Sequence, residues 1–192
     1  MRRKAVVVLL AALSLVSIKM GTGHGEDTAI LTGNHPREAE TASMGNADPN
    51  QPLSMEIHFA VRNEAELNQL LAEQQNPSSP NYRRWLATGE YDRRFGPRQS
   101  DIDAVADWLK SEGFTVESAS DGSIKFAGTV AQAQRTFSVR IARFGDGSAY
   151  ANVSDPSIPA RFAGVISNVS GLDNMTHVMP GGPRRIVPKP VR

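Results

Sequence analysis

The 192-residue chain contains no cysteine, so disulfide bonds, thiolate metal sites and cysteine nucleophiles are all excluded. It also lacks an excess of either charge, because 21 basic and 20 acidic residues leave a formal net charge of +1. Such a balance gives no electrostatic reason to expect binding to nucleic acid or to an anionic membrane. The length suits one ordinary domain with tails.

Histidine is scarce as well, and three of the four histidines, His24, His35 and His177, lie in segments that we predict to be disordered. His58 falls on the outward face of a predicted strand, where an exposed histidine is commoner than a catalytic one. No metal-ligand cluster, phosphate-binding loop or nucleophile motif occurs in a fitting context. We therefore predict no catalytic residue, no metal and no cofactor.

Two further functional classes find little support. Asp101, Asp103 and Asp107 are close in sequence, but the helix dipole explains the first two and solvation of a polar helix face explains the third. The strand around residues 124–128 matches poorly the aromatic pattern by which a four-stranded sheet stacks RNA bases. We expect no nucleic-acid partner.

The longest apolar run, residues 5–18, is shorter than the roughly 20 residues that a membrane-spanning helix needs. It follows Arg2, Arg3 and Lys4, as in a secretory signal. We predict a signal peptide in residues 1–25, cut anywhere from Ser17 to Gly25, with an uncleaved membrane anchor as the alternative. Cleavage would leave a secreted or periplasmic (extracellular) protein without a stable membrane anchor.

Polar segments flank the patterned part of the chain. Residues 26–52 are rich in Gly, Thr, Asn, Glu and Pro without an apolar period, which predicts a disordered lead-in. Residues 175–192 are rich in Pro, Gly and basic residues and are predicted to form a disordered tail.

Between these segments the apolar residues alternate between strand and helix periods. Residues 55–61 predict a half-buried strand, and Asn63 with Glu66 forms a capping-box-like pair that opens a helix carrying leucines at 67, 70 and 71. The Asp121–Gly122 step predicts an antiparallel hairpin, and Thr129 caps a short helix. The other expected elements are a helix from Ser100 to Gly113, a strand over 139–142, a turn into a short run over 149–153 and a last short helix over 159–166.

This order is the βαββαβ pattern of a ferredoxin-like split fold, an α+β class with an antiparallel sheet and here an extra helix after the first strand. The helix after Ser100 is the best defined element. Gly113 at its end would let Phe114 fold back on Leu109, as in a Schellman cap. The fold itself hosts many functions and decides none of them.

Residues 76–97 combine turn residues with unusually large side chains. Pro77 and Pro80 fix the backbone, while Tyr82, Trp85 and Phe95 supply apolar bulk where a plain loop would be polar. We interpret this segment as a packed connection whose aromatic side chains close the core.

The same segment opens a series of motifs. They are Pro77-Ser78-Ser79-Pro80-Asn81-Tyr82, Trp85-Leu86, Phe95-Gly96-Pro97, Trp108-Leu109, Phe126-Ala127-Gly128-Thr129-Val130, Phe137, Tyr150-Ala151-Asn152, Pro156-Ser157-Ile158-Pro159 and Gly171-Leu172-Asp173. This ordered set, over residues 53–174, resembles the activation pro-domain of the sedolisin (kumamolisin-type) serine-carboxyl peptidases. The family-motif residues that we expect in the core are Tyr82, Trp85, Leu86, Phe95, Trp108, Leu109, Gly113 and Phe126.

The resemblance has two local departures. Arg83 stands where the family commonly has His after the Tyr, which removes a pH-sensitive group. Ala87-Thr88-Gly89 stands where the family has a Thr-Pro step, and Gly89 adds chain entropy where Pro would reduce it.

The resemblance implies a pro-domain that inhibits a sedolisin-type catalytic domain and assists its folding, here as a stand-alone or truncated chain that is monomeric when free. The Ser, Glu and Asp of the family's catalytic domain have no counterpart after residue 173, so we expect no peptidase activity from this chain. Leu172, Asp173, Asn174 and Met175 are the expected peptidase-cleft segment, because extended backbone pairs well in a peptidase groove. The alternative is a decayed gene product, or a secreted envelope interaction module without a peptidase partner.

Overall fold

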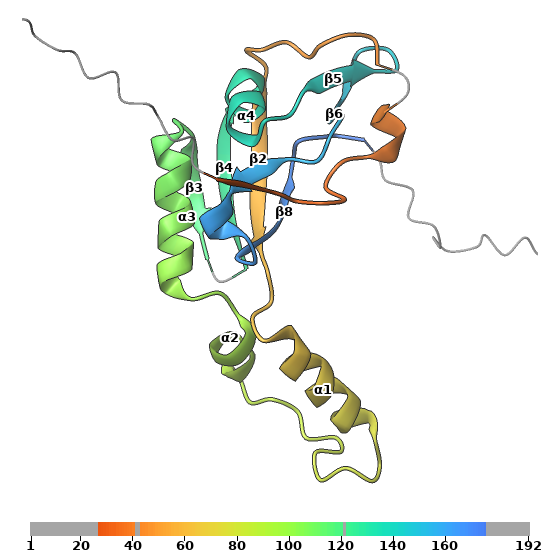
Figure 1. Cartoon of the computed structure of the whole chain (residues 1–192), viewed down its shortest axis with the longest axis vertical. Coiled ribbons are helices and arrows are strands. Elements are labelled where there is room, and N and C mark those ends of the chain that lie inside the picture. Colours follow the sequence, from red (N-terminus) through yellow and green to blue (C-terminus); the bar gives the residue numbers. More distant parts are fainter. Residues whose placement is uncertain (1–26, 41–42, 121, 176–192) are drawn as a thin grey trace, which may run out of the picture.

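A four-stranded antiparallel sheet lies at the centre of the computed structural model, which describes residues 27–40, 43–120 and 122–175 (Figure 1). The predicted signal peptide and the tail from residue 176 lie outside these residues. The sheet has the order β3-β4-β2-β8, with β2 at Pro52–Phe59, β3 at Thr115–Ala119, β4 at Ser123–Thr129 and β8 at Ile166–Ser170. This is the strand order of a ferredoxin-like split fold, so the predicted fold class is confirmed.

Two helices cover one face of this sheet, α3 at Gln99–Ser111 and α4 at Val130–Phe137. Between them lies an aromatic cluster in which the rings of Phe114 and Phe126 are 5.1 Å apart and those of Trp108 and Phe137 are 5.9 Å apart. Edge-on and tilted contacts of this kind are the favourable geometries for aromatic pairs. The core therefore consists of one sheet face closed by two amphipathic helices.

The predicted caps of α3 and α4 can be compared with the structure. Phe114 N–H donates to the Leu109 carbonyl and Gly113, at φ 88°, donates to Lys110, so the Schellman cap is confirmed. The capping box of Thr129 with Gln132 is also confirmed. The predicted N-cap at Ser100 is wrong, because α3 already begins at Gln99.

The fourth strand of the sheet lies later in the chain than predicted. Residues 139–142 instead contribute to β5 (Ile141–Phe144), which pairs with β6 (Ala149–Asn152) in a separate hairpin. The predicted helix over 159–166 is also wrong, since only a single 3-10 turn, η2 at Ala160–Phe162, forms there.

A bulge explains why the sequence pattern did not predict strand β8. His58 pairs with Asn168 but Phe59 pairs with Ile166, so one residue of β8 is left unpaired between them. The bulge puts Ile166 and Val169 on one buried face although they are three residues apart, a spacing typical of a helix.

The prediction of a disordered lead-in is wrong for the part of it that the structure describes. Strand β1 (Thr28–Ile30) pairs with β7 (Ser157–Pro159), and a 3-10 turn, η1, follows at Arg37–Glu40. The Asn34 side chain donates to the Val169 carbonyl at 2.9 Å and accepts from its N–H at 2.7 Å. Long-range hydrogen bonds order this segment together with a few buried residues, Ala39 and Ala47 among them, that follow no apolar period. For that reason its polar composition was misleading.

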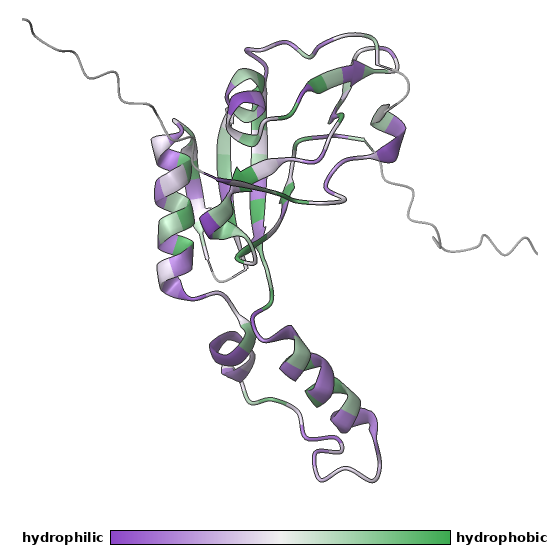
Figure 2. Ribbon diagram, viewed as in Figure 1, coloured by the Kyte–Doolittle hydropathy of each residue, from purple (hydrophilic) through white to green (hydrophobic). Residues whose placement is uncertain are grey.

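Two helices stand apart from the sheet and form what we call the arm, residues 63–95 (Figure 1). It consists of α1 (Glu64–Gln75), a long loop and α2 (Glu90–Phe95). We call the remaining described residues the body. Figure 2 shows polar and apolar residues mixed along α1, and the only buried residue of this helix is Gln74.

The predicted capping box at the start of α1 is absent. Asn63 has φ 52° and makes no side-chain cap bond, while Glu66 accepts from Arg94 of α2 at 2.7 Å. The two helices of the arm are therefore held together by a polar contact where the sequence predicted a local cap.

Candidate functional site

The family-motif residues divide between the body and the arm. Trp108, Leu109 and Phe126 are buried in the body, and Phe95 is buried where the arm joins it. Gly113 closes α3 with a left-handed backbone that a side chain would strain. These motif positions serve the fold.

The loop of the arm exposes part of the motif, which corrects our prediction that the aromatic residues of this segment close the core. Trp85 is 74% exposed and Tyr91 is 43% exposed, while Tyr82 and Leu86 are half-buried. The reason is geometric, because the loop after α1 lies at the far end of the arm from the sheet (Figure 1). The flanking pair Arg83-Arg84 was the available signal, since two adjacent arginines rarely accompany a residue into a core.

Local hydrogen bonds fix the loop that carries Trp85. Buried Gln74 donates from Nε2 to the Arg84 carbonyl at 2.5 Å, and its own carbonyl accepts from Arg83 N–H at 3.0 Å. Arg83 sits at φ 54°, a region that non-glycine residues seldom adopt. Asn81 donates to Glu73 at 2.6 Å. The loop therefore has a defined conformation without a hydrophobic core of its own.

The second end of the loop is held by Glu90. Its carboxylate accepts from Ala87 N–H at 3.0 Å and from Arg94 at 2.9 Å. The Ala87 N–H bond, followed by the Arg94 side chain, lowers the pKa of Glu90 from its ordinary value. The ionised form of Glu90 is thus the one that holds the arm together.

One face of the four-stranded sheet is not covered by the described helices. On this side Glu56 of β2 lies across from Lys125 of β4 and Ser170 of β8. The remaining members, all exposed or half-buried, are Ser54, His58, Thr115, Ala127 and Asn168. We call this set the open face, and most of its members are polar.

His58 lies on the open face, as predicted, with Nε2 3.2 Å from the Ser170 hydroxyl. A nucleophilic site would need a third group to orient the imidazole and a pocket to exclude water. This contact is exposed, and no carboxylate bonds to the His58 ring among the described residues. The same part of the chain contains no group of three metal-ligating side chains and no helix long and apolar enough to cross a membrane.

The predicted cleft segment is attached to the body. Leu172 is buried, and its carbonyl accepts from Asn152 N–H at 3.1 Å. Asn174 N–H donates to the Tyr150 carbonyl at 3.0 Å, and its side-chain oxygen accepts from Tyr150 N–H at 2.7 Å. Leu172 and Asn174 therefore follow strand β6 as an added extended segment, with Asp173 between them, and Met175 packs against the small cluster under β5 and β6.

Near the same edge, a polar cluster joins the lead-in to Asp155, in the loop before β7. The Asp155 carboxylate accepts from Gly33 N–H at 2.9 Å and Asn34 N–H at 2.7 Å, and it lies 2.7 Å from Nδ1 of His35. Burial acts to raise the pKa of Asp155, but the hydrogen bonds from His35, Gly33 and Asn34 outweigh it and hold the pKa below its ordinary value. No sequence pattern indicates this cluster, because Asp155 is about 120 residues away from its partners.

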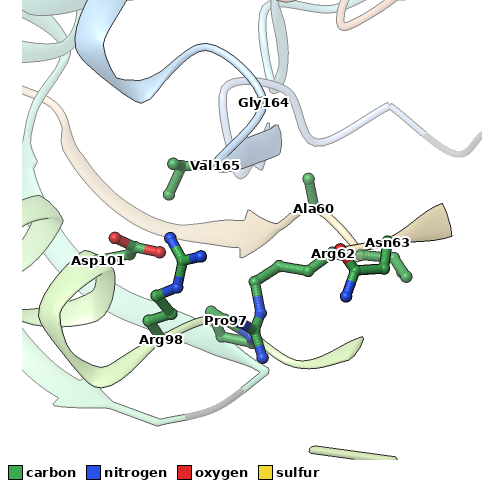
Figure 3. A pocket seen from close by; sticks show the side chains of 9 residues that line it. Ala60, Arg62, Asn63, Pro97, Arg98, Asp101, Gly164 and Val165 are labelled. Atoms are coloured by element: carbon green, nitrogen blue, oxygen red, sulfur yellow. The ribbon is translucent and has the colours of Figure 1, made fainter. Parts of the chain in front are cut away.

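A pocket of about 300 Å³ lies where the arm meets the body (Figure 3). Figure 3 shows Arg98 extending beside Asp101 and Val165, and Arg62 lying over Pro97. Arg62 has a structural role, because its guanidinium donates to the Gly96 and Arg93 carbonyls at the end of α2. Asp101 is the one carboxylate among the lining residues, and none of them is a serine, threonine or histidine, so the lining does not pair a hydroxyl nucleophile with a base.

Comparison with known proteins matches residues 39–175 to the family described as Pro-kumamolisin, activation domain. Xanthomonalisin from Xanthomonas sp. (strain T-22) is 31% identical over 172 residues, which are 88% of this chain and 20% of that protein. Sedolisin from Pseudomonas sp. (strain 101) is 27% identical over 132 residues, 65% of this chain and 22% of that protein. Tripeptidyl-peptidase sed4 from Aspergillus fumigatus is 30% identical over 102 residues, 53% of this chain and 17% of that protein.

The chain thus spans about one fifth of the length of the curated relatives it matches. The match includes the four-stranded sheet, its two covering helices and the whole arm. The chain belongs to the Pro-kumamolisin activation domain family and represents the pro-domain part of a sedolisin-type peptidase.

Proposed function

We propose that this chain inhibits the catalytic domain of a sedolisin-type peptidase and assists its folding, and that it does not hydrolyse peptides itself. The observation that carries the proposal is the family match over residues 39–175, which includes nearly all of the described part of the chain. A folded pro-domain acts on its partner by binding the native state more tightly than the unfolded state, which stabilises the native state by mass action.

The open face is the surface that we propose for docking. Its polar side chains stand on a rigid sheet, so binding costs little backbone ordering. The extended segment through Asn174 is hydrogen-bonded to the β6 edge. Because Leu172 and Asn174 are held by the body, the residues that we propose to enter the peptidase groove begin after Met175. An extended chain in such a groove is recognised through its main-chain hydrogen bonds.

An inhibition assay with the full chain tests this function. The chain at micromolar concentration is added to the catalytic portion of xanthomonalisin, and peptide hydrolysis is followed between pH 3 and pH 7. We expect saturable inhibition, together with faster recovery of activity when the denatured catalytic portion is refolded in the presence of the chain. Unchanged hydrolysis over the whole pH range would refute the inhibitory role.

A matched pair of variants tests the docking surface. Ser54→Arg places a large cation on the open face, and Ala104→Arg places the same cation on the exposed side of α3. We expect Ser54→Arg to weaken inhibition at least about tenfold, equivalent to 1.4 kcal/mol, and Ala104→Arg to inhibit like the original chain. The reverse order of effects would place the docking surface on the helical side.

We also propose that the chain acts outside the cytoplasm as a monomer when free. The predicted signal in residues 1–25 and the peptidase relatives support export. Fractionation of cells that express the full chain, with sequencing of the exported product's first residues, tests this. A product that remains in the cytoplasm and still begins at Met1 would refute it.

A further inference from the structure

The tip of the arm, Tyr82 to Trp85, exposes its most hydrophobic side chain. Trp85 is 74% exposed, more than any other large apolar residue in the described part of the chain. Ile30 at 64% and Met44 at 62% follow it. Isolated exposed apolar residues are common on protein surfaces. The tip differs from such cases in its backbone and in its charge.

The backbone of the tip is fixed by hydrogen bonds to α1. Gln74 is the one buried residue of α1, and both its side chain and its carbonyl hydrogen-bond to the tip. These bonds hold Arg83 in the left-handed region at φ 54°. Strained backbone of this kind persists where surrounding structure enforces it, and it is concentrated at functional sites. Trp85 is therefore presented from a preorganised loop.

The charge of the tip is uncompensated. Arg83 and Arg84 are exposed, and neither forms an ion pair within the part of the chain that the structure describes. Arg94 of the same arm, in contrast, pairs with both Glu66 and Glu90. The Arg83 guanidinium lies 5.0 Å from the centre of the Tyr82 ring. A guanidinium left without a carboxylate partner is suited to bind one on another molecule, with two parallel hydrogen bonds.

Tryptophan, tyrosine and arginine are the residues that most often dominate the binding energy of protein interfaces. We propose that the tip of the arm is a second docking site for the peptidase catalytic domain, on which Trp85 enters an apolar pocket and Arg83 and Arg84 bind carboxylates at its rim. This inference rests on the proposed function. It identifies the partner surface as acidic with an apolar pocket.

The dimensions permit both contacts to be made by one partner. The 172 matched residues are 20% of xanthomonalisin, so several hundred residues of that protein lie outside the match. A domain of that size is roughly 50 Å across. Helix α1 has 12 residues, which extend the arm by only about 18 Å. One such domain can therefore contact the open face and the tip together.

Binding of the full chain to the catalytic portion of xanthomonalisin, measured by calorimetry, tests the proposal. We expect Trp85→Ala to weaken binding at least about 30-fold, as for a central interface tryptophan. Arg83→Ala/Arg84→Ala is expected to weaken it about tenfold and to reduce its salt dependence, since two cationic contacts are lost. The matched controls are Ile30→Ala and Arg140→Ala/Arg143→Ala, which remove exposed residues of the same kinds from the body.

A spectroscopic measurement separates contact from an indirect effect. The chain has two tryptophans, so 5-fluorotryptophan labelling gives two fluorine resonances, and Trp85→Phe assigns them. The Trp85 resonance is expected to shift on binding, while that of Trp108, which is 6% exposed, stays in place. Gln74→Ala should weaken binding about fivefold through the loop, with both Trp85 and the arginines still present.

The outcomes distinguish this inference from the proposed function. Tight binding by the original chain and equally tight binding by Trp85→Ala would overturn the tip as a docking site and leave the inhibitor role intact. An original chain that does not bind at all would overturn both. Trp85-dependent binding to phosphatidylglycerol vesicles, with unchanged binding of Trp85→Ala to the peptidase, would overturn the inference in favour of a membrane contact.

Discussion

The two tryptophans of the chain lie in opposite settings. Trp108 is 6% exposed and packs against Phe137 and Phe162 in the body, whereas Trp85 is 74% exposed at the tip of the arm. The body derives its order from an apolar core between a sheet and two helices. The arm derives its order from hydrogen bonds and ion pairs, since its first helix buries a glutamine and no leucine. Residues such as Trp108 therefore stabilise the fold, whereas residues such as Trp85 are held by the fold on its surface.

The largest effect that tests this contrast is expected for Trp108, in the body. Trp108→Ala removes a side chain that contacts two other buried aromatic rings, at 5.9 Å and 5.4 Å between centroids. We expect a loss of about 3–5 kcal/mol in the free energy of unfolding, measured by denaturant titration. Trp108→Phe should recover a large part of the loss, because a ring remains in the cavity. A loss below about 1 kcal/mol for the alanine variant would mean that the core is not closed by this cluster.

The next effect concerns the turn that leads into the extended segment through Asn174. Gly171 has φ 85°, and a Cβ there would clash with the Ser54 carbonyl oxygen. We expect Gly171→Ala to lower the unfolding free energy by about 2–4 kcal/mol. Gly145→Ala is the matched control, since Gly145 has φ 62° but open space around the Cβ position, and a loss of about 1 kcal/mol is expected. Equal losses would show that backbone strain alone, without the clash, decides both.

The sequence was most informative where structure depends on neighbouring residues. Gly113 and Thr129 marked the ends of α3 and the start of α4 correctly, because caps are local. It was misleading at β8, where a bulge changes the spacing of Ile166 and Val169, and at Asn34, whose partner is 135 residues away. It was also misleading at Trp85, because residue type does not reveal whether a loop packs on the body or extends from it.

A third prediction tests whether polar contacts order the lead-in as the core orders the body. Because the pKa of Asp155 is lower in the folded chain than its ordinary value of 3.8, its contribution to stability is complete above that value. The contribution is lost as the pH falls through the folded pKa. We expect Asp155→Asn to cost about 1–3 kcal/mol at pH 6 and less at pH 3, which lies below the ordinary pKa of the carboxyl, as measured by chemical unfolding.

The exposed carboxylate of Asp107 on α3 supplies the control for this effect. Asp107→Asn is expected to leave the unfolding free energy unchanged at both pH values, since a surface contact with Lys110 at 3.2 Å contributes little. An Asp155→Asn penalty that is equal at pH 6 and pH 3 would show that the carboxylate charge is not what holds the lead-in. Hydrogen exchange at Gly33 and Asn34, whose N–H groups donate to Asp155, would then locate the lost contact.

The smallest expected effect on stability is that of Trp85→Ala, which completes the comparison of the two tryptophans. Its side chain is mostly in water in the free chain, so truncation should change the unfolding free energy by less than about 0.5 kcal/mol. The same variant is expected to have the largest effect on binding to the peptidase. A substitution that is silent in denaturant titration and severe in calorimetry belongs to an interface, whereas Trp108→Ala should show the opposite result. If Trp85→Ala destabilised the chain as much as Trp108→Ala does, the Trp85 indole would be filling a cavity of the arm. Trp85 would then stabilise the fold as Trp108 does, and the contrast between the two tryptophans would be wrong.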